Sequence, residues 1–66
     1  MRIKINGQWE QRPSPLTLGQ LLEALSLQGR RVAVELNEAI VRRADHARTE
    51  LAENDHLEIV TLVGGG

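Results

Sequence analysis

A single leucine stripe is the sequence feature that most limits how this chain can fold. Thr17 and Gln20 have the T-x-x-Q spacing of a helix capping box, in which each side chain bonds the other residue's backbone amide. Four leucines then follow the i, i+3, i+4, i+7 spacing that puts them on one face of a helix: Leu18, Leu21, Leu22 and Leu25. We expect Gly29 to take the left-handed position after the last turn. One helix with one apolar face needs a second layer to cover that face.

The segment before the helix has the pattern of a β-hairpin. Apolar Met1, Ile3 and Ile5 alternate with polar residues, which is the period-2 pattern of a half-buried strand. Asn6-Gly7 follows directly, and this pair favours a type I′ turn because both residues accept positive φ. The return strand, residues 8–12, carries one large apolar side chain, Trp9, which we expect to be partly exposed.

The segment after the helix predicts two further strands, separated by an irregular crossover. Residues 32–36 and 57–63 are strands, residues 39–41 form a short extended piece, and residues 42–50 hold at most a helical turn around 44–48. Turns are expected at Asn37-Glu38 and at residues 53–55, because Asn tolerates the left-handed conformation.

This order of elements favours an α+β fold in which one helix packs across one face of a mixed sheet. With the first and last strands adjacent, the arrangement is a β-grasp, the ubiquitin-like fold; a ferredoxin-like or other small α+β domain has similar elements and stays an alternative. We expect one domain over residues 1–66, with residues 64–66 as a flexible tail. The predicted core is Met1, Ile3, Ile5, Leu18, Leu21, Leu22, Leu25, Val32, Val34, Leu36, Ile40, Leu51, Leu57 and Ile59.

Composition excludes several classes of function. The chain has no cysteine, so it supplies neither a catalytic thiol nor a thiolate metal site, and its two histidines lack the spacing of a metal pair. A net charge of −1 disfavours nucleic-acid binding. No apolar run approaches the ~20 residues of a membrane span, so we expect a cytoplasmic protein. We expect no catalytic residues and no bound cofactor, because 66 residues leave little wall for a deep pocket.

The three glycines of residues 64–66 are the most informative functional feature. They could be a frayed end, but a terminus without side chains can also thread a narrow channel in a partner enzyme. The carboxylate of Gly66 would then be the group that becomes an activated acyl group. The chain has no phosphate-binding loop, so a partner would have to supply ATP. Beside the tail, Val60, Leu62 and Val63 break the inward alternation, and they either cover the sheet or form a docking patch.

The charged residues of the crossover form two short runs of opposite sign. Arg42, Arg43 and Arg48 are basic, and Glu50, Glu53 and Asp55 are acidic. Most such runs are solvated surface. If either has a role, we expect it to steer a partner, which changes the association rate more than the affinity.

Several of these segments together resemble the ThiS family, the small sulfur carrier proteins of thiamin biosynthesis. The resemblance extends over the hairpin of residues 1–7, the leucine-rich helix, the run Val-Ala-Val-Glu-Leu-Asn at residues 32–37 with Ile40-Val41 and Arg43, and the glycine tail. Its specific parts are the Val-Glu-Leu-Asn stretch and the tail, in which Gly65 and Gly66 match the family's Gly-Gly. Two positions differ: Arg42 stands where the family often has Pro, and Asn54 where it often has Gly.

The resemblance implies a β-grasp fold and the role of a protein carrier without catalytic activity of its own. It implies that an adenylyltransferase related to ubiquitin-activating enzymes uses ATP and Mg²⁺ to adenylate Gly66, with the tail of Gly64, Gly65 and Gly66 inserted in its site. A persulfide sulfur then replaces AMP to give a thiocarboxylate, and thiazole synthase takes that sulfur. Two related proteins have similar tails and stay alternatives: the small subunit of molybdopterin synthase, and a ubiquitin-like modifier that is conjugated to lysines. A plain binding module is a third.

Overall fold

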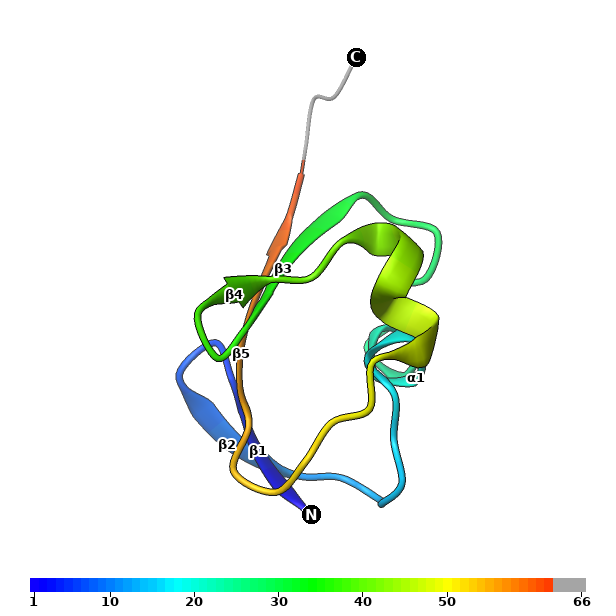
Figure 1. The fold of residues 1–66 in the computed structure, drawn as a ribbon. Helices are drawn as coiled ribbons and strands as arrows, with labels where there is room; N and C mark the ends of the chain where they lie inside the picture. The colour runs from blue at the N-terminus through cyan, green and yellow to red at the C-terminus, as the bar shows by residue number, and fades with distance from the viewer. Residues whose placement is uncertain (63–66) are drawn as a thin grey trace.

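The computed structural model describes residues 1–62, and the predicted tail of residues 64–66 lies outside that part of the chain. The described residues form five strands, one α-helix and one 3₁₀ helix (Figure 1). In order, these are β1 (Arg2–Ile5), β2 (Gln8–Gln11), α1 (Leu18–Ala24), β3 (Val32–Leu36), β4 (Ala39–Ile40), η1 (Arg43–Arg48) and β5 (His56–Thr61). The last strand therefore begins one residue earlier, and ends two residues earlier, than the sequence predicts.

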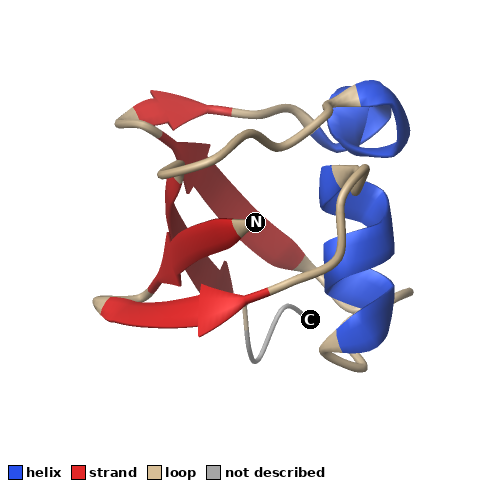
Figure 2. Ribbon diagram, turned by 90° about the horizontal axis from the view of Figure 1, so that it is seen from below, coloured by secondary structure: helices blue, strands red, loops and turns tan. Residues whose placement is uncertain are grey.

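The strands form one mixed sheet in the order β2-β1-β5-β3-β4. The first and last strands, β1 and β5, lie side by side and parallel at its centre, and the other pairs are antiparallel. Helix α1 and η1 lie on one side of the sheet, as Figure 2 shows, and leave the other side open. This is the predicted β-grasp arrangement, and it excludes the ferredoxin-like alternative. Within residues 1–62, no helix has the length and hydropathy needed to cross a membrane.

Both hairpins turn at the residues that the sequence predicts. Asn6 and Gly7 have φ of 50° and 86°, and Asn37 and Glu38 have φ of 51° and 72°. Two successive positive φ values are typical of a type I′ turn, whose twist matches that of the strands it joins. Asn54 takes the left-handed conformation at the third predicted turn, with φ of 71°, which is the conformation that a glycine would also accept.

Helix α1 begins as predicted and ends earlier than predicted. The Gln20 amide donates to Thr17 Oγ1 at 3.1 Å, and the Thr17 amide donates to Gln20 Oε1 at 2.8 Å, which completes the capping box. The helix ends at Ala24, and Ser26 rather than Gly29 takes the first left-handed position, with φ of 61°.

The physical reason for this early end is a Schellman motif built on Ser26. The Ser26 amide donates to the Glu23 carbonyl at 3.0 Å, and the Leu27 amide donates to the Leu22 carbonyl at 2.8 Å. These two bonds satisfy carbonyls that the last turn would otherwise leave unpaired. Gly29 also has positive φ, 79°, but it lies in the next turn.

The core lies between α1 and the sheet, and it matches most of the prediction. Among residues 1–62, ten apolar residues are buried: Ile3, Ile5, Leu16, Leu18, Leu21, Leu22, Val34, Leu51, Leu57 and Ile59. Four other predicted members are half-buried and pack against these: Met1, Leu25, Val32 and Leu36. Leu16 was absent from the predicted core, although it precedes the helix cap.

The prediction that Ile40 belongs to the core is wrong. Its side chain is 68% exposed, because β4 pairs with β3 in a register that places Ile40 opposite Glu35 on the open face of the sheet. The next residue, Val41, packs against the core instead. A slip of one residue exchanges the two faces of a strand, and a two-residue strand carries too little pattern to fix its register.

Candidate functional site

The candidate site is the end of β5 from which residues 63–66 continue. This strand is anchored on both sides, by β1 through a parallel ladder and by β3 through five antiparallel residue pairs. At its far end, the Leu62 amide donates to the Arg31 carbonyl at 2.8 Å. The end of β5 and Leu62 therefore have a fixed position in the domain.

Two turn asparagines add side-chain bonds to the backbone of β5. Asn6 Oδ1 accepts from the Ile59 amide at 2.7 Å, while Asn6 Nδ2 donates to the Ile59 carbonyl at 3.1 Å. Asn37 Oδ1 accepts from the His56 amide at 2.9 Å. Sequence reasoning assigned these asparagines to turns only, because the partner of a side-chain amide depends on the tertiary arrangement. Each hairpin thus holds the strand that leads to the tail.

The predicted docking residues that the structure describes are exposed. Leu57 and Ile59 point into the core, and the alternation of the strand places Val60 on the open face, where it is 55% exposed. Leu62 is 49% exposed, so its prediction as an exposed residue is also confirmed. Val63 and the tail residues Gly64, Gly65 and Gly66 lie outside the described part of the chain.

Further small or apolar residues on β3 and β4 extend this surface. Ala33 is the direct partner of Val60 in the ladder, and Ile40 lies on the same open face. We call this surface the outer apolar patch; its members are Ala33, Ile40, Val60 and Leu62. An exposed apolar surface of this kind beside the last strand can bury area against a partner.

The opposite end of the open face has a different character. Trp9 is 42% exposed, as expected, and its ring lies 4.2 Å from Arg2 Cζ and 5.6 Å from Lys4 Nζ. His56 meets the same ring edge-on, with 5.4 Å between centroids. Trp9 thus packs with cations on the outer surface and does not contribute to the core.

His46 is a buried residue that sequence reasoning did not single out. It is 8% exposed, and its Nε2 donates to the Val41 carbonyl at 3.1 Å. It lies in η1, where its ring connects that helix to the segment after β4. Among residues 1–62, no group of three or more His, Cys, Asp or Glu could hold a metal ion.

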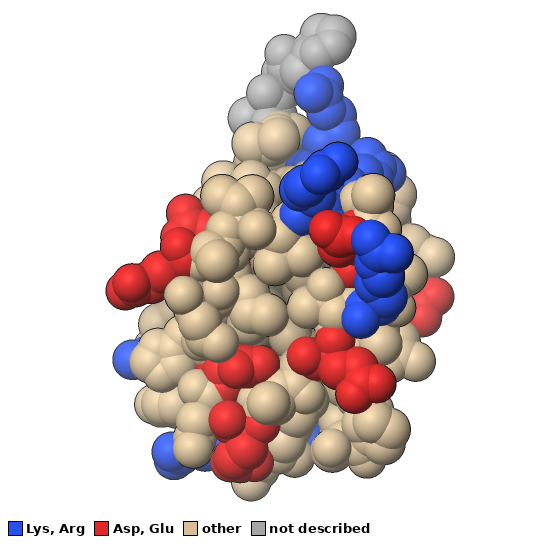
Figure 3. All heavy atoms as spheres, in the orientation of Figure 1, with Lys and Arg blue, Asp and Glu red and all other residues tan. Residues whose placement is uncertain are grey.

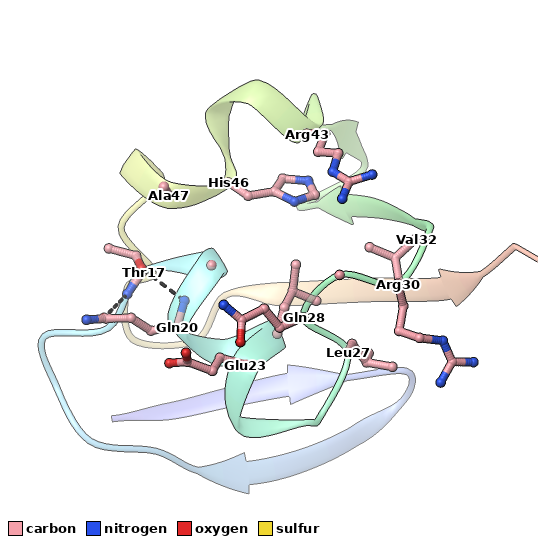
Figure 4. A pocket seen from close by; sticks show the side chains of 13 residues that line it. Thr17, Gln20, Glu23, Leu27, Gln28, Arg30, Val32, Arg43, His46 and Ala47 are labelled. Carbon is pink, nitrogen blue, oxygen red and sulfur yellow. Dashed lines mark hydrogen bonds between the residues drawn. The ribbon is translucent and has the colours of Figure 1, made fainter.

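His46 also lines an open hollow of about 440 Å³ between α1, η1 and the loop before β3. Figure 4 shows Thr17, Gln20 and Glu23 on its helix wall, with Arg43 beside His46 on the wall formed by η1. The hollow is open to solvent and is lined by polar, basic and apolar side chains, which another protein could contact.

Comparison with known proteins identifies the family. The family model described as "ThiS family" matches residues 3–66. The sulfur carrier protein ThiS of Bacillus subtilis is 33% identical over 67 residues, an alignment that covers 97% of this chain and 98% of that protein. The crystal structure of the thiamine biosynthesis protein ThiS from Geobacter metallireducens is 30% identical, covers 100% of both chains and superposes with a TM-score of 0.84.

A longer relative contains a segment similar to this entire chain. A thiazole synthase of Paramagnetospirillum magneticum is 38% identical over 66 residues, and the chain spans only 20% of that protein's length. A thiazole synthase of Magnetococcus marinus has the same identity and the same 20% share. The match to the family model and the match of fold lead to one conclusion: the chain belongs to the ThiS family, the sulfur carrier proteins of thiamin biosynthesis.

Proposed function

We propose that this protein carries sulfur on its terminal carboxylate, at Gly66, and donates it for thiazole formation. A partner adenylyltransferase of the ubiquitin-activating type would bind ATP and Mg²⁺ and receive Gly64, Gly65 and Gly66 in its active site. The carrier itself binds no cofactor. Because the first step consumes ATP, we place the cycle in the cytoplasm.

The proposed chemistry begins with an unreactive group. The Gly66 carboxylate attacks the α-phosphorus of ATP, pyrophosphate leaves, and the product is an acyl-adenylate. The terminal sulfur of a persulfide then attacks the acyl carbon and AMP leaves. A thiol reduces the resulting acyl disulfide, which releases the thiocarboxylate and a disulfide. Mg²⁺ spreads the phosphate charge during the first step.

The observation that carries the proposal is the match to a sulfur carrier over nearly the whole of both chains, together with the glycines that follow β5. Glycine lets a backbone approach another protein more closely than any residue with a side chain. The anchored end of β5 and the outer apolar patch support it further, because they provide a fixed base and a docking surface for the tail. The sequence also predicts Val63 as a docking residue next to this patch.

Thiazole synthase is the proposed acceptor of the sulfur. The two thiazole synthases that contain a segment similar to this chain support this partner, since a carrier and its acceptor act in succession and a covalent link would keep them together. Two competing functions remain to be tested: the sulfur carrier of molybdopterin synthase and a ubiquitin-like modifier.

The intact mass of the protein from its native host tests the proposal. We expect a fraction in which one oxygen has been replaced by sulfur, with the change confined to Gly66 in the fragment spectrum. A strain that lacks the thiazole synthase should accumulate this form, because its consumption is blocked. Attachment to lysines of other proteins would instead show a modifier. Accumulation only in a strain that lacks molybdopterin synthase would show the other carrier.

A further inference from the structure

Four arginines from two separate segments gather at the end of the molecule where β5 ends. Arg30 and Arg31 directly precede β3, and the backbone of Arg31 bonds Leu62. Arg42 and Arg43 follow β4, which runs antiparallel to β3 and so returns to the same end. Figure 3 shows Lys and Arg atoms concentrated at this end. We call Arg30, Arg31, Arg42 and Arg43 the arginine cluster; it holds four of the chain's eight basic residues.

The membership of this cluster differs from the basic run in the sequence. Arg48 was grouped with Arg42 and Arg43, but in the fold it forms an ion pair with Asp45 in η1. Arg30 joins the cluster from a position twelve residues before Arg42. The run of charges along the chain could not reveal this grouping, because the β3–β4 hairpin creates it.

The fold does not neutralise three of these arginines. Arg30, Arg42 and Arg43 are exposed, and none of them forms an ion pair with a carboxylate of residues 1–62. Neighbouring like charges repel one another, so the cluster costs stability rather than adding to it. A chain of net charge −1 that places half of its cations at one end has a marked charge asymmetry there.

The hollow described above opens beside the cluster. Arg43 lies on its η1 wall and Arg30 at the opposite border, next to Val32, as Figure 4 shows. Leu22 and Leu27 contribute apolar surface. A hollow of about 440 Å³ between two arginines can receive side chains of another protein, with carboxylates at the arginine end.

We propose that the arginine cluster and the adjoining hollow form a second docking surface, which binds an acidic segment of the enzyme that activates the tail. This inference rests on the proposed function. The outer apolar patch lies on the open face of the sheet and the hollow on the helix side, so the partner contacts the domain on both sides of the point where the tail leaves.

An acidic protein segment fits this surface better than the phosphates of ATP. Four residues, 63–66, follow Leu62, and a chain of four residues spans at most about 13–14 Å. The screening length at physiological ionic strength is about 8 Å, so charges at the base of an extended tail act weakly on a nucleotide at its tip. The arginines can instead contact the surface of the partner enzyme around the channel that receives the tail.

The experiment compares two charge reversals of equal size in the full chain. One variant combines Arg42→Glu with Arg43→Glu, and the control combines Arg2→Glu with Lys4→Glu at the Trp9 end of the sheet. Direct binding to the adenylyltransferase of the same organism is measured by calorimetry at low salt and at about 0.15 M salt. Circular dichroism melts of each variant show that the domain is folded, and Arg42→Gln with Arg43→Gln repeats the test without new carboxylates.

We expect the cluster variants to bind the adenylyltransferase at least about tenfold more weakly than the wild type at low salt. Their affinity should also depend much less on the salt concentration. The control variant should bind within about twofold of the wild type. Equal binding by all the proteins would overturn the inference, and so would an equal loss in the control, which would show an effect of net charge alone. A raised KM for ATP with unchanged binding of the carrier would assign the arginines to phosphate instead. ATP–pyrophosphate exchange by the wild type is recorded separately: binding without exchange would contradict the proposed function and leave the docking surface standing.

Discussion

His46 illustrates how a single buried polar residue can join two segments. Its Nε2 donates to the Val41 carbonyl at 3.1 Å, and the residue is only 8% exposed. We expect His46→Leu to lower the free energy of unfolding by about 1–3 kcal/mol, because the ring is replaced by an apolar side chain and the carbonyl loses its partner. Urea denaturation measures this loss. His56→Leu on the exposed face is the control, and equal losses in both variants would show that the buried bond contributes nothing.

Leu22 and Ile40 provide a matched pair for testing which face is the core. Leu22 is buried in the helix stripe, whereas Ile40 is 68% exposed on the open face. Leu22→Ala should lower the free energy of unfolding by about 2–5 kcal/mol, a large part of the stability of so small a domain. Ile40→Ala should change it by less than about 0.5 kcal/mol. The reverse order of losses in chemical denaturation would mean that the two faces have been exchanged.

At the scale of elements, the two hairpins act on β5 through their turn asparagines. Asn6→Gly keeps a residue that accepts φ of 50°, but it removes both bonds to the Ile59 backbone. We expect a loss of about 1–3 kcal/mol in the free energy of unfolding, corresponding to two hydrogen bonds.

Asn54→Gly is the control for this prediction. Asn54 also has positive φ, and its side chain makes no hydrogen bond with the rest of residues 1–62. The same substitution there should change the stability by less than about 0.5 kcal/mol. Similar losses at both positions would show that the effect comes from the turn and that the bonds to β5 are unimportant.

Local sequence patterns correctly predict the elements whose start or turn is set by neighbouring residues. Thr17 with Gln20 starts α1 through side-chain bonds to each other's amides, and Asn6-Gly7 turns the first hairpin because both residues accept positive φ. Both signals act between residues that are close in the sequence. The helix ends before Ser26 rather than before Gly29, although glycine accepts the left-handed conformation more easily. The amides of Ser26 and Leu27 bond carbonyls of the last turn, and a sequence pattern does not show those bonds. Ile40 was misplaced because a two-residue strand takes its register from its neighbour.

Some features of the candidate site could likewise be predicted from local patterns, and others could not. The exposure of Val60 and Leu62 follows from alternation and could be predicted. The asparagine bonds to β5, the burial of His46 and the gathering of Arg30 with Arg43 could not, because each joins segments that are distant in the sequence.

For the whole molecule, the outer apolar patch should matter for binding and not for folding. Val60→Asp with Leu62→Asp should change the stability by no more than about 1 kcal/mol, since both side chains are half-exposed. Binding to the adenylyltransferase should weaken by at least about tenfold, because the charges prevent apolar burial. Trp9→Gln at the other end of the same face should leave binding unchanged. If the double variant unfolds, these residues belong to the core; if it binds normally, the docking face lies elsewhere.

The reacting carboxylate is the central claim for the whole molecule, and ATP–pyrophosphate exchange with the adenylyltransferase tests it most directly. Three proteins are compared: the full chain, one with Gly66 deleted, and one with an alanine added after Gly66. Deletion withdraws the carboxylate by one residue, about 3.3–3.6 Å of extended chain. A misplacement of about 1 Å can already cost about 10²-fold in rate. We therefore expect exchange with the full chain only, while all three proteins fold and bind the enzyme. Equal exchange by the three would show that the carboxylate at Gly66 is not the reacting group.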